Sequence, residues 1–210
     1  EAMNRMHTVV SLIELGHEER AKAFAVDGLH VTQQLTDDLV SSIKEPALAA
    51  LLLGKASEAG EIGIDFDVEA EGELAEGVFE ARDLVTIVGN LIDNAFDATQ
   101  NRTTGLDRPA TVEVGLHVTD NLLHVVVVDS GDGAPADTST MFTRGWTTKS
   151  DSGGQAHGLG LALVQQIVHR LRGSIEVRDE EGAMFSIELP FSLDPTANPE
   201  EVTDATGSRR

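Results

Sequence analysis

Asn90 and Asn94 are the first residues of this 210-residue chain whose types and spacing suggest chemistry. Because they stand four positions apart, both carboxamides would project from one face of a helix. An Asn oxygen is a hard ligand of the kind that Mg²⁺ accepts beside substrate phosphates and water. Two solvated or capping asparagines would show the same spacing, so the pair alone does not separate a metal site from an ordinary helix surface.

Asp129 is a second candidate, since it follows four consecutive valines and precedes Gly131 and Gly133. A carboxylate at the wet end of an apolar pocket can accept a hydrogen bond from an exocyclic amine such as that of adenine. The glycines would let the backbone approach a ring closely. An ordinary turn after a strand also uses Asp and Gly, so this pattern is moderately specific.

A glycine-rich stretch over residues 153–161 opens a predicted helix, where flexible amides and a helix N-terminus together favour an anion. A loop rather than a strand precedes it and no G-K-[ST] sequence occurs, which argues against Rossmann and P-loop folds. Lys149, in the preceding loop, is the cation that we expect beside the phosphates. A solvated loop lysine is the competing interpretation.

Hydrophobic periodicity predicts the elements that must position these residues. The predicted helices cover residues 46–61, 81–99 and 157–173, the last closed by Gly173 as a C-cap. The predicted strands cover 62–68, 111–118, 122–129, 174–179 and 183–190. The Gly-rich segment 130–156, without a clear period, is predicted to be a long functional loop.

The N-terminal part differs, because two apolar helical stripes, the second running from Phe24 to Ile43, predict a helical hairpin over residues 1–44. Two helices cannot bury such stripes alone, so we expect a homodimer through residues 1–43. A second domain is predicted over 45–193, and the polar tail 194–210 is expected to be disordered. The start at Glu1, inside a predicted helix, suggests a truncated hairpin from a larger protein.

Composition excludes several function classes. Thirty-six acidic residues against 15 basic ones give a formal charge of −21, which argues against a broad cationic face for nucleic acid or anionic lipid. The absence of cysteine excludes disulfides, thiolate metal sites and a cysteine nucleophile. The longest apolar run, 47–53, is too short to cross a bilayer, so we expect that this chain is not membrane-embedded.

The three motifs occur in the order N-x-x-x-N, D-x-G-x-G and G-x-G-L. Together they resemble the N, G1 and G2 boxes of the ATPase fold shared by sensor histidine kinases, gyrase and MutL, and MFTRGWTTKS is similar to the F box and ATP lid. The resemblance covers about residues 80–190. It implies an α/β two-layer sandwich, in which a mixed sheet is backed by helices, preceded here by the helical dimerisation hairpin.

The resemblance also implies roles for individual residues. Asn94 would hold Mg²⁺, Asp129 would bind adenine N6, and the loop from Phe142 to Gly158 would close over the phosphates of ATP. The implied ATP-binding residues are Asn90, Asn94, Asp129, Gly131, Gly133, Phe142, Thr148, Lys149, Gly158, Leu159, Gly160 and Leu161.

The start of the chain, EAMNRMH, is similar to the citrate and dicarboxylate sensor kinases, whose H box reads H-E-x-x-N-x-x-H. Glu1 and Asn4 match its acidic residue and its Asn, and His7 matches the second His, so the phosphoacceptor His would immediately precede Glu1. The resemblance implies transfer of the γ-phosphoryl group of ATP to that His, with Glu1 accepting its proton or orienting it and Asn4 positioning the phosphoryl group. A response-regulator Asp would be the final acceptor.

Such a kinase would be the cytoplasmic part of a receptor anchored in the inner membrane. Two departures from the family pattern predict modest nucleotide affinity: Asp97 stands where many relatives carry Lys or Arg, and Ala183 replaces the Thr of G-T-x-F. Two alternatives remain open. One is a protein serine kinase of the anti-sigma-factor type, and the other is a non-catalytic phosphotransfer or scaffold module.

Overall fold

The computed structural model describes residues 42–192, apart from positions 120, 136, 143–158 and 180. Three α-helices, five strands and one 3-10 helix lie within these ranges. In chain order they are α3 (Pro46–Ile62), β1 (Asp65–Glu71), α4 (Ala81–Gln100), β2 (Thr111–Thr119), β3 (Leu122–Asp129), η1 (Thr138–Phe142), α5 (Gly160–Arg170), β4 (Ser174–Asp179) and β5 (Ala183–Pro190).

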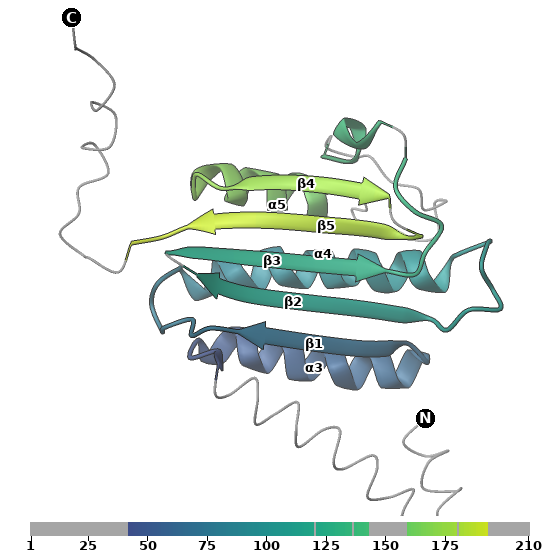
Figure 1. The fold of residues 1–210 in the computed structure, drawn as a ribbon, viewed down its shortest axis with the longest axis horizontal. Coiled ribbons are helices and arrows are strands. Elements are labelled where there is room, and N and C mark those ends of the chain that lie inside the picture. The colour runs from purple at the N-terminus through teal and green to yellow at the C-terminus, as the bar shows by residue number, and fades with distance from the viewer. Residues whose placement is uncertain (1–41, 120, 136, 143–158, 180, 193–210) are drawn as a thin grey trace, which may run out of the picture.

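The five strands form one mixed sheet in the order β1-β2-β3-β5-β4. β1 is parallel to β2, and the other neighbours are antiparallel. A parallel pair needs a crossover, which α4 supplies between β1 and β2. All three helices lie on one face of the sheet, with α3 near β1 and α5 near β4 (Figure 1). The predicted two-layer α/β sandwich is thereby confirmed.

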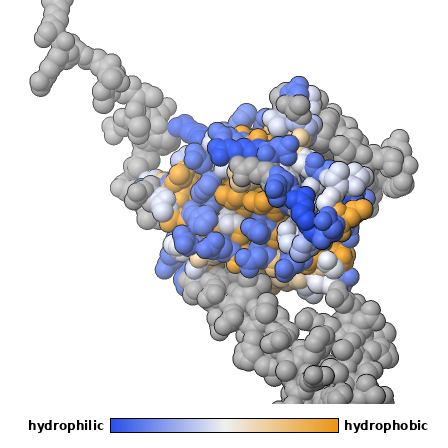
Figure 2. All heavy atoms as spheres, turned by 45° about the vertical axis from the view of Figure 1, so that its right-hand side comes forward, coloured by the Kyte–Doolittle hydropathy of each residue, from blue (hydrophilic) through white to orange (hydrophobic). Residues whose placement is uncertain are grey.

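Alternation along the strands decides which side chains enter the core. On β2, Val112, Val114 and Leu116 are buried under the helices, whereas Glu113 faces the open side of the sheet. The apolar stripe of α4 is fully buried against this layer. On the surface, hydrophobic residues appear in patches between hydrophilic ones (Figure 2).

Local capping fixes the bounds of α3. Pro46 occupies its first turn, the Glu45 side chain accepts a hydrogen bond from the Ala47 amide at 3.4 Å, and Gly63 ends it in the left-handed conformation with φ 75°. The helix therefore includes Ile62, and β1 begins three residues later than predicted.

The prediction of Gly173 as the cap of α5 is wrong. The helix ends at Arg170, and Arg172, with φ 59°, adopts the left-handed conformation instead. Gly173 serves a different purpose: a Cβ there would overlap the backbone oxygen of Glu188 and press on Leu189. The glycine lets the chain pass close to β5.

Ile43 belongs to the core between the sheet and the helices rather than to the hairpin stripe in which it was predicted. It is 4% exposed and forms an isolated parallel bridge with Leu74. The Lys44 amide donates to the Leu74 oxygen at 2.9 Å, and the Leu74 amide donates to the Ser42 oxygen at 3.0 Å. The rest of the predicted hairpin, its dimer contacts and the tail from 193 onward lie outside the described residues.

Two glycine substitutions should have opposite effects on stability. Gly173→Ala should lower the free energy of unfolding by about 1–3 kcal/mol, because the new methyl group must displace backbone. Gly54→Ala, on the exposed face of α3 with nothing within 4 Å of a new Cβ, should raise it by about 0.5–1 kcal/mol. Urea denaturation checks both values, and equal effects would contradict the close approach at Gly173.

Candidate functional site

One flank of α4 carries Asn90, Asn94 and Ala98, which are only partly exposed and follow one another at four-residue spacing. Burial of the neighbouring apolar stripe against the sheet leaves this flank for other contacts. Eight residues of helix span about 12 Å. At one end the flank meets the start of α5, and at the other it meets the turn that follows β3.

Asn90 joins α4 to α5. Its Nδ2 donates to the Thr86 oxygen at 2.6 Å, which fixes the carboxamide. Its Oδ1 lies 2.5 Å from where a Cβ of Gly160 would stand, so a larger residue at the first position of α5 would have to displace the Asn90 carboxamide. The helices run antiparallel, and Arg170 at the far end of α5 donates to Asp83 at 2.6 Å. The N-cap residue Leu159 gives the first amides of α5 no side-chain hydrogen bond, and the start of this helix lies beside Asn90.

The Asn94 carboxamide is unusual because its Nδ2 is fully buried, yet none of the described residues hydrogen-bonds to it. Buried amides normally have partners, so a bound group is expected to complete this one. Within the described ranges no group of three or more His, Asp or Glu side chains could hold a metal. Because Nδ2 can only donate, the group that completes it must be an acceptor, such as a phosphate or water oxygen. Any Mg²⁺ would be held through the Asn94 oxygen, together with phosphates and water.

Asp129 is the buried acid of the site, 5% exposed at the end of β3. Its Oδ1 accepts hydrogen bonds from the Gly131 amide at 2.8 Å and the Ala183 amide at 3.2 Å. Burial raises the pKa of the carboxyl above its ordinary value, and the two amides offset part of this rise. None of the described hydrogen bonds uses its second oxygen, which can accept a hydrogen bond from an amine of a ligand.

Glycines make this turn possible. A Cβ on Gly131 would stand 2.8 Å from Asp129 Oδ1 and 3.0 Å from the Ala98 Cβ, so the turn is wedged between the carboxylate and α4. Gly133 has φ 91°, and a Cβ there would overlap Asp179 Oδ1. Both glycines of the D-x-G-x-G motif are therefore required by geometry.

The structure thus brings the three motifs together around α4. Residues 79–193 match the family described as histidine kinase-, DNA gyrase B- and HSP90-like ATPases. The chain belongs to this ATPase family. The resemblance predicted from the order of the three boxes is confirmed.

The relatives are sensor kinases. A probable C4-dicarboxylate sensor kinase of Halalkalibacterium halodurans is 38% identical over 196 residues, covering 90% of this chain and 36% of that protein. The sensor histidine kinase DcuS of Escherichia coli K12 is 32% identical, with coverage of 91% and 34%. The chain therefore spans about a third of the length of these curated relatives.

The fold agrees with a solved structure. The catalytic domain of the histidine kinase ThkA superposes with a TM-score of 0.55 at 22% identity, covering 69% of this chain and 90% of that one. None of the helices in the described part is long and apolar enough to span a bilayer.

Of the other residues predicted to be functional, some lie in the described part of the chain and the rest lie outside it. Phe142 ends η1 and packs half-buried against the core, whereas Leu159 is 48% exposed just before α5. Leu161 is 7% exposed within the core, so only its backbone is available to a ligand. Outside the described residues lie Glu1, Asn4, His7, Thr148, Lys149 and Gly158.

Sequence reasoning missed Gly182 and the role of the Ala183 backbone. Gly182 has φ 153°, and a Cβ there would overlap the Asp129 oxygen, so glycine brings β5 against the end of β3. This approach places the Ala183 amide on the carboxylate. The glycine of EGAMF was the signal for this contact. No sequence pattern predicted that the loop 101–110 contacts the turn after Asp129.

Asp129→Asn should be at least as stable as the wild-type protein at pH 7, because the amide oxygen can still accept both backbone bonds without a buried charge. Folding raises the pKa of Asp129, so the wild-type carboxyl loses stability as pH rises from about 4, the ordinary value, through the higher folded-state pKa. The difference in free energy of unfolding between Asp129→Asn and the wild type should therefore grow in favour of the variant across that pH interval. Urea denaturation between pH 4 and 8 measures it, and a variant that is less stable by the same amount at every pH would contradict this.

Proposed function

We propose that this chain is the catalytic core of a sensor histidine kinase that binds Mg-ATP and passes its γ-phosphoryl group to a His, and then to a response-regulator Asp. Membership of the ATPase family and the sensor-kinase relatives support the class. The observation that carries nucleotide binding is the Asp129 carboxylate, in which one oxygen is held by two amides and the other is unused by the described residues.

In this proposal Asp129 accepts a hydrogen bond from the 6-amino group of adenine, and Gly131 and Gly133 leave room for the ring. Asn94 holds Mg²⁺, which neutralises phosphate charge when bound. The phosphates lie toward the first amides of α5, near Gly160, and Lys149 supplies a countercharge. The chain contributes mainly positioning and charge neutralisation, as phosphoryl transfer requires.

The acceptor side rests on the H-box alignment. We place the phosphorylated His immediately upstream of Glu1, with Glu1 orienting it or accepting its proton and Asn4 positioning the phosphoryl group. Residues 1–43 would hold two chains together as a homodimer. The full-length protein would be an inner-membrane receptor whose kinase part lies in the cytoplasm, and a response-regulator receiver domain would be its partner.

Phosphorylation with γ-labelled ATP and Mg²⁺ tests this function. We expect an acid-labile, alkali-stable label on a chain extended upstream by its native residues, and no label on residues 1–210 alone. Asn94→Ala in the extended chain should abolish the label, because the metal ligand is lost. Gln100→Ala, which removes an exposed amide at the end of the same helix, is the matched control and should retain it.

Two outcomes would contradict the proposal. A label on residues 1–210 that is lost in His7→Gln would make His7 the acceptor and refute the alignment. No label on either chain, with ATP binding intact, would favour the serine-kinase or phosphotransfer alternatives.

A further inference from the structure

Asp132 lies in the middle of the turn that follows Asp129, and it fastens that turn to a distant loop. Its carboxylate accepts hydrogen bonds from both backbone amides and both hydroxyls of Thr103 and Thr104, at 2.7–2.9 Å. These residues lie in the loop between α4 and β2. The amide of Thr104 and the other three donors hold the pKa of Asp132 well below its ordinary value, so the carboxylate stays ionised at neutral pH.

Arg102 fastens the same turn from its other end. Its guanidinium donates to Ser130 Oγ at 3.1 Å, and also to the backbone oxygens of Pro109 at 2.9 Å and Arg108 at 2.7 Å. Ser130 Oγ in turn accepts from the Thr111 amide at 2.9 Å. Ser130 directly follows Asp129, so both residues that flank Gly131 are tied to the loop 101–110.

The hydrogen bond from the Gly131 amide to Asp129 Oδ1, at 2.8 Å, is shorter than the one from the Ala183 amide, at 3.2 Å. Its direction depends on how the turn 130–132 is held, because Gly131 has no side chain of its own to fix it. On the other side, Gly131 touches Ala98 of α4. A loose turn would therefore move the amide that orients the carboxylate.

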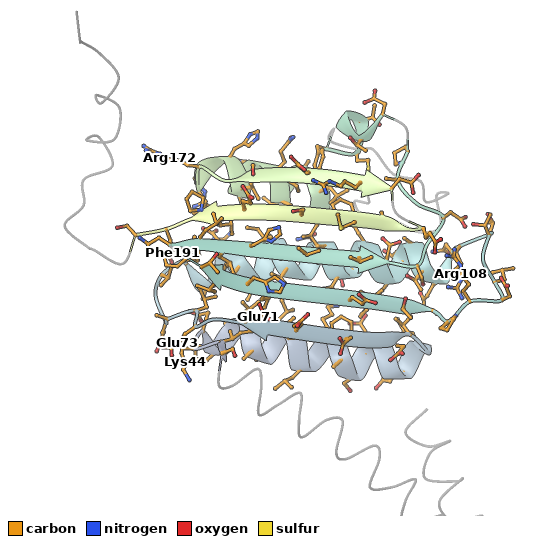
Figure 3. The ribbon with its side chains drawn as sticks, viewed as in Figure 1. Lys44, Glu71, Glu73, Arg108, Arg172 and Phe191 are labelled. Carbon is orange, nitrogen blue, oxygen red and sulfur yellow. The ribbon has the colours of Figure 1, made fainter. Side chains whose placement is uncertain are left out.

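The hydrogen bonds between the loop 101–110 and the turn 130–132 lie at one end of the molecule. Arg108 of the same loop is at the end of the sheet opposite Lys44 and Glu73 (Figure 3). Its bond to Glu181, at 3.1 Å, connects the loop to the β4–β5 turn, but both side chains are largely exposed. An exposed pair of this kind contributes little. Asp132, Thr103 and Thr104 are exposed as well, but their hydrogen bonds and those of Arg102 are made to the turn beside Asp129 itself.

We infer that Asp132 is a positioning residue for the adenine subsite: by holding the turn 130–132 to Thr103 and Thr104, it sets the orientation of the second Asp129 oxygen and thereby the preference for a 6-aminopurine. The inference rests on the proposed binding of ATP. It assigns Asp132 no contact with the nucleotide, so its effect must appear as a loss of selectivity.

The test compares dissociation constants for ATP and for purine riboside triphosphate, which lacks the 6-amino group. The wild-type chain should prefer ATP by at least about tenfold, since a hydrogen bond to a charged acceptor is at stake. In Asp132→Ala this ratio should fall toward one, chiefly through weaker ATP binding. Asp132→Asn, whose amide oxygen can still accept from the threonines, should recover part of the ratio.

Asp107→Ala is the matched control, since it removes an exposed acid from the same loop and none of the described residues hydrogen-bonds to its side chain. It should leave both dissociation constants unchanged. If Asp132→Ala does not fold, as judged by its thermal transition, the double variant Thr103→Val, Thr104→Val tests the same idea. That variant removes only the two hydroxyl donors and should give an intermediate ratio.

The outcomes separate the two proposals. A wild-type chain that binds neither nucleotide, or both equally, would refute the proposed role of Asp129. A wild-type preference that Asp132→Ala retains would overturn the positioning role. Equal weakening of both nucleotides in Asp132→Ala would also overturn it, because general loosening of the domain does not change selectivity.

Discussion

Burial of one carboxylate at the end of β3 is the constraint on which the rest of the site depends. A charge removed from water is costly unless hydrogen bonds compensate it. Here the compensation comes from two backbone amides that belong to separate segments, Gly131 and Ala183. The chain can bring them to one oxygen only because residues 131 and 182 are glycines. Burial raises the pKa of Asp129 although the two amides lower it. None of the described residues hydrogen-bonds to the second oxygen, which can therefore accept a hydrogen bond from a ligand.

α4 converts this local arrangement into an extended site. The sheet buries its apolar stripe, and the adjacent flank then presents Asn90, Asn94 and Ala98 in a row. Gly160 at one end and Gly131 at the other both exist to let backbone approach that flank. Three motifs far apart in the sequence thus lie along one helix: the first is part of α4, and the other two contact it. The ion pair between Asp83 and Arg170 keeps α5 alongside it.

Much of this could be predicted from the sequence, because the relevant signals are local. The 3.6-residue period of α4 and the alternation in β2 and β3 depend on residues close in the chain, and the order of the three boxes predicted the family. The cap of α5 was misplaced because Gly173 is explained by a contact with β5, 15 residues further on. Ile43 was misassigned because its stripe continued a helical pattern, while its actual partner is Leu74.

The ties of Asp132 and Arg102 could not have been predicted for the same reason. They join residues 28 or 29 positions apart through side chains that are ordinary in any polar loop. Only the packed sheet and α4 bring the two loops together. Sequence patterns therefore predicted the residues that we propose to contact a nucleotide, and the structure shows which residues hydrogen-bond to the turn beside Asp129.

The most direct test of the account is a crystal structure of this chain with Mg²⁺ and a non-hydrolysable ATP analogue. We expect the 6-amino nitrogen of adenine within hydrogen-bond distance, about 3 Å, of the second Asp129 oxygen. We also expect Mg²⁺ bound to the Asn94 oxygen and to phosphate. An adenine bound elsewhere, or one whose amine faces away from Asp129, would contradict the proposed role of this carboxylate.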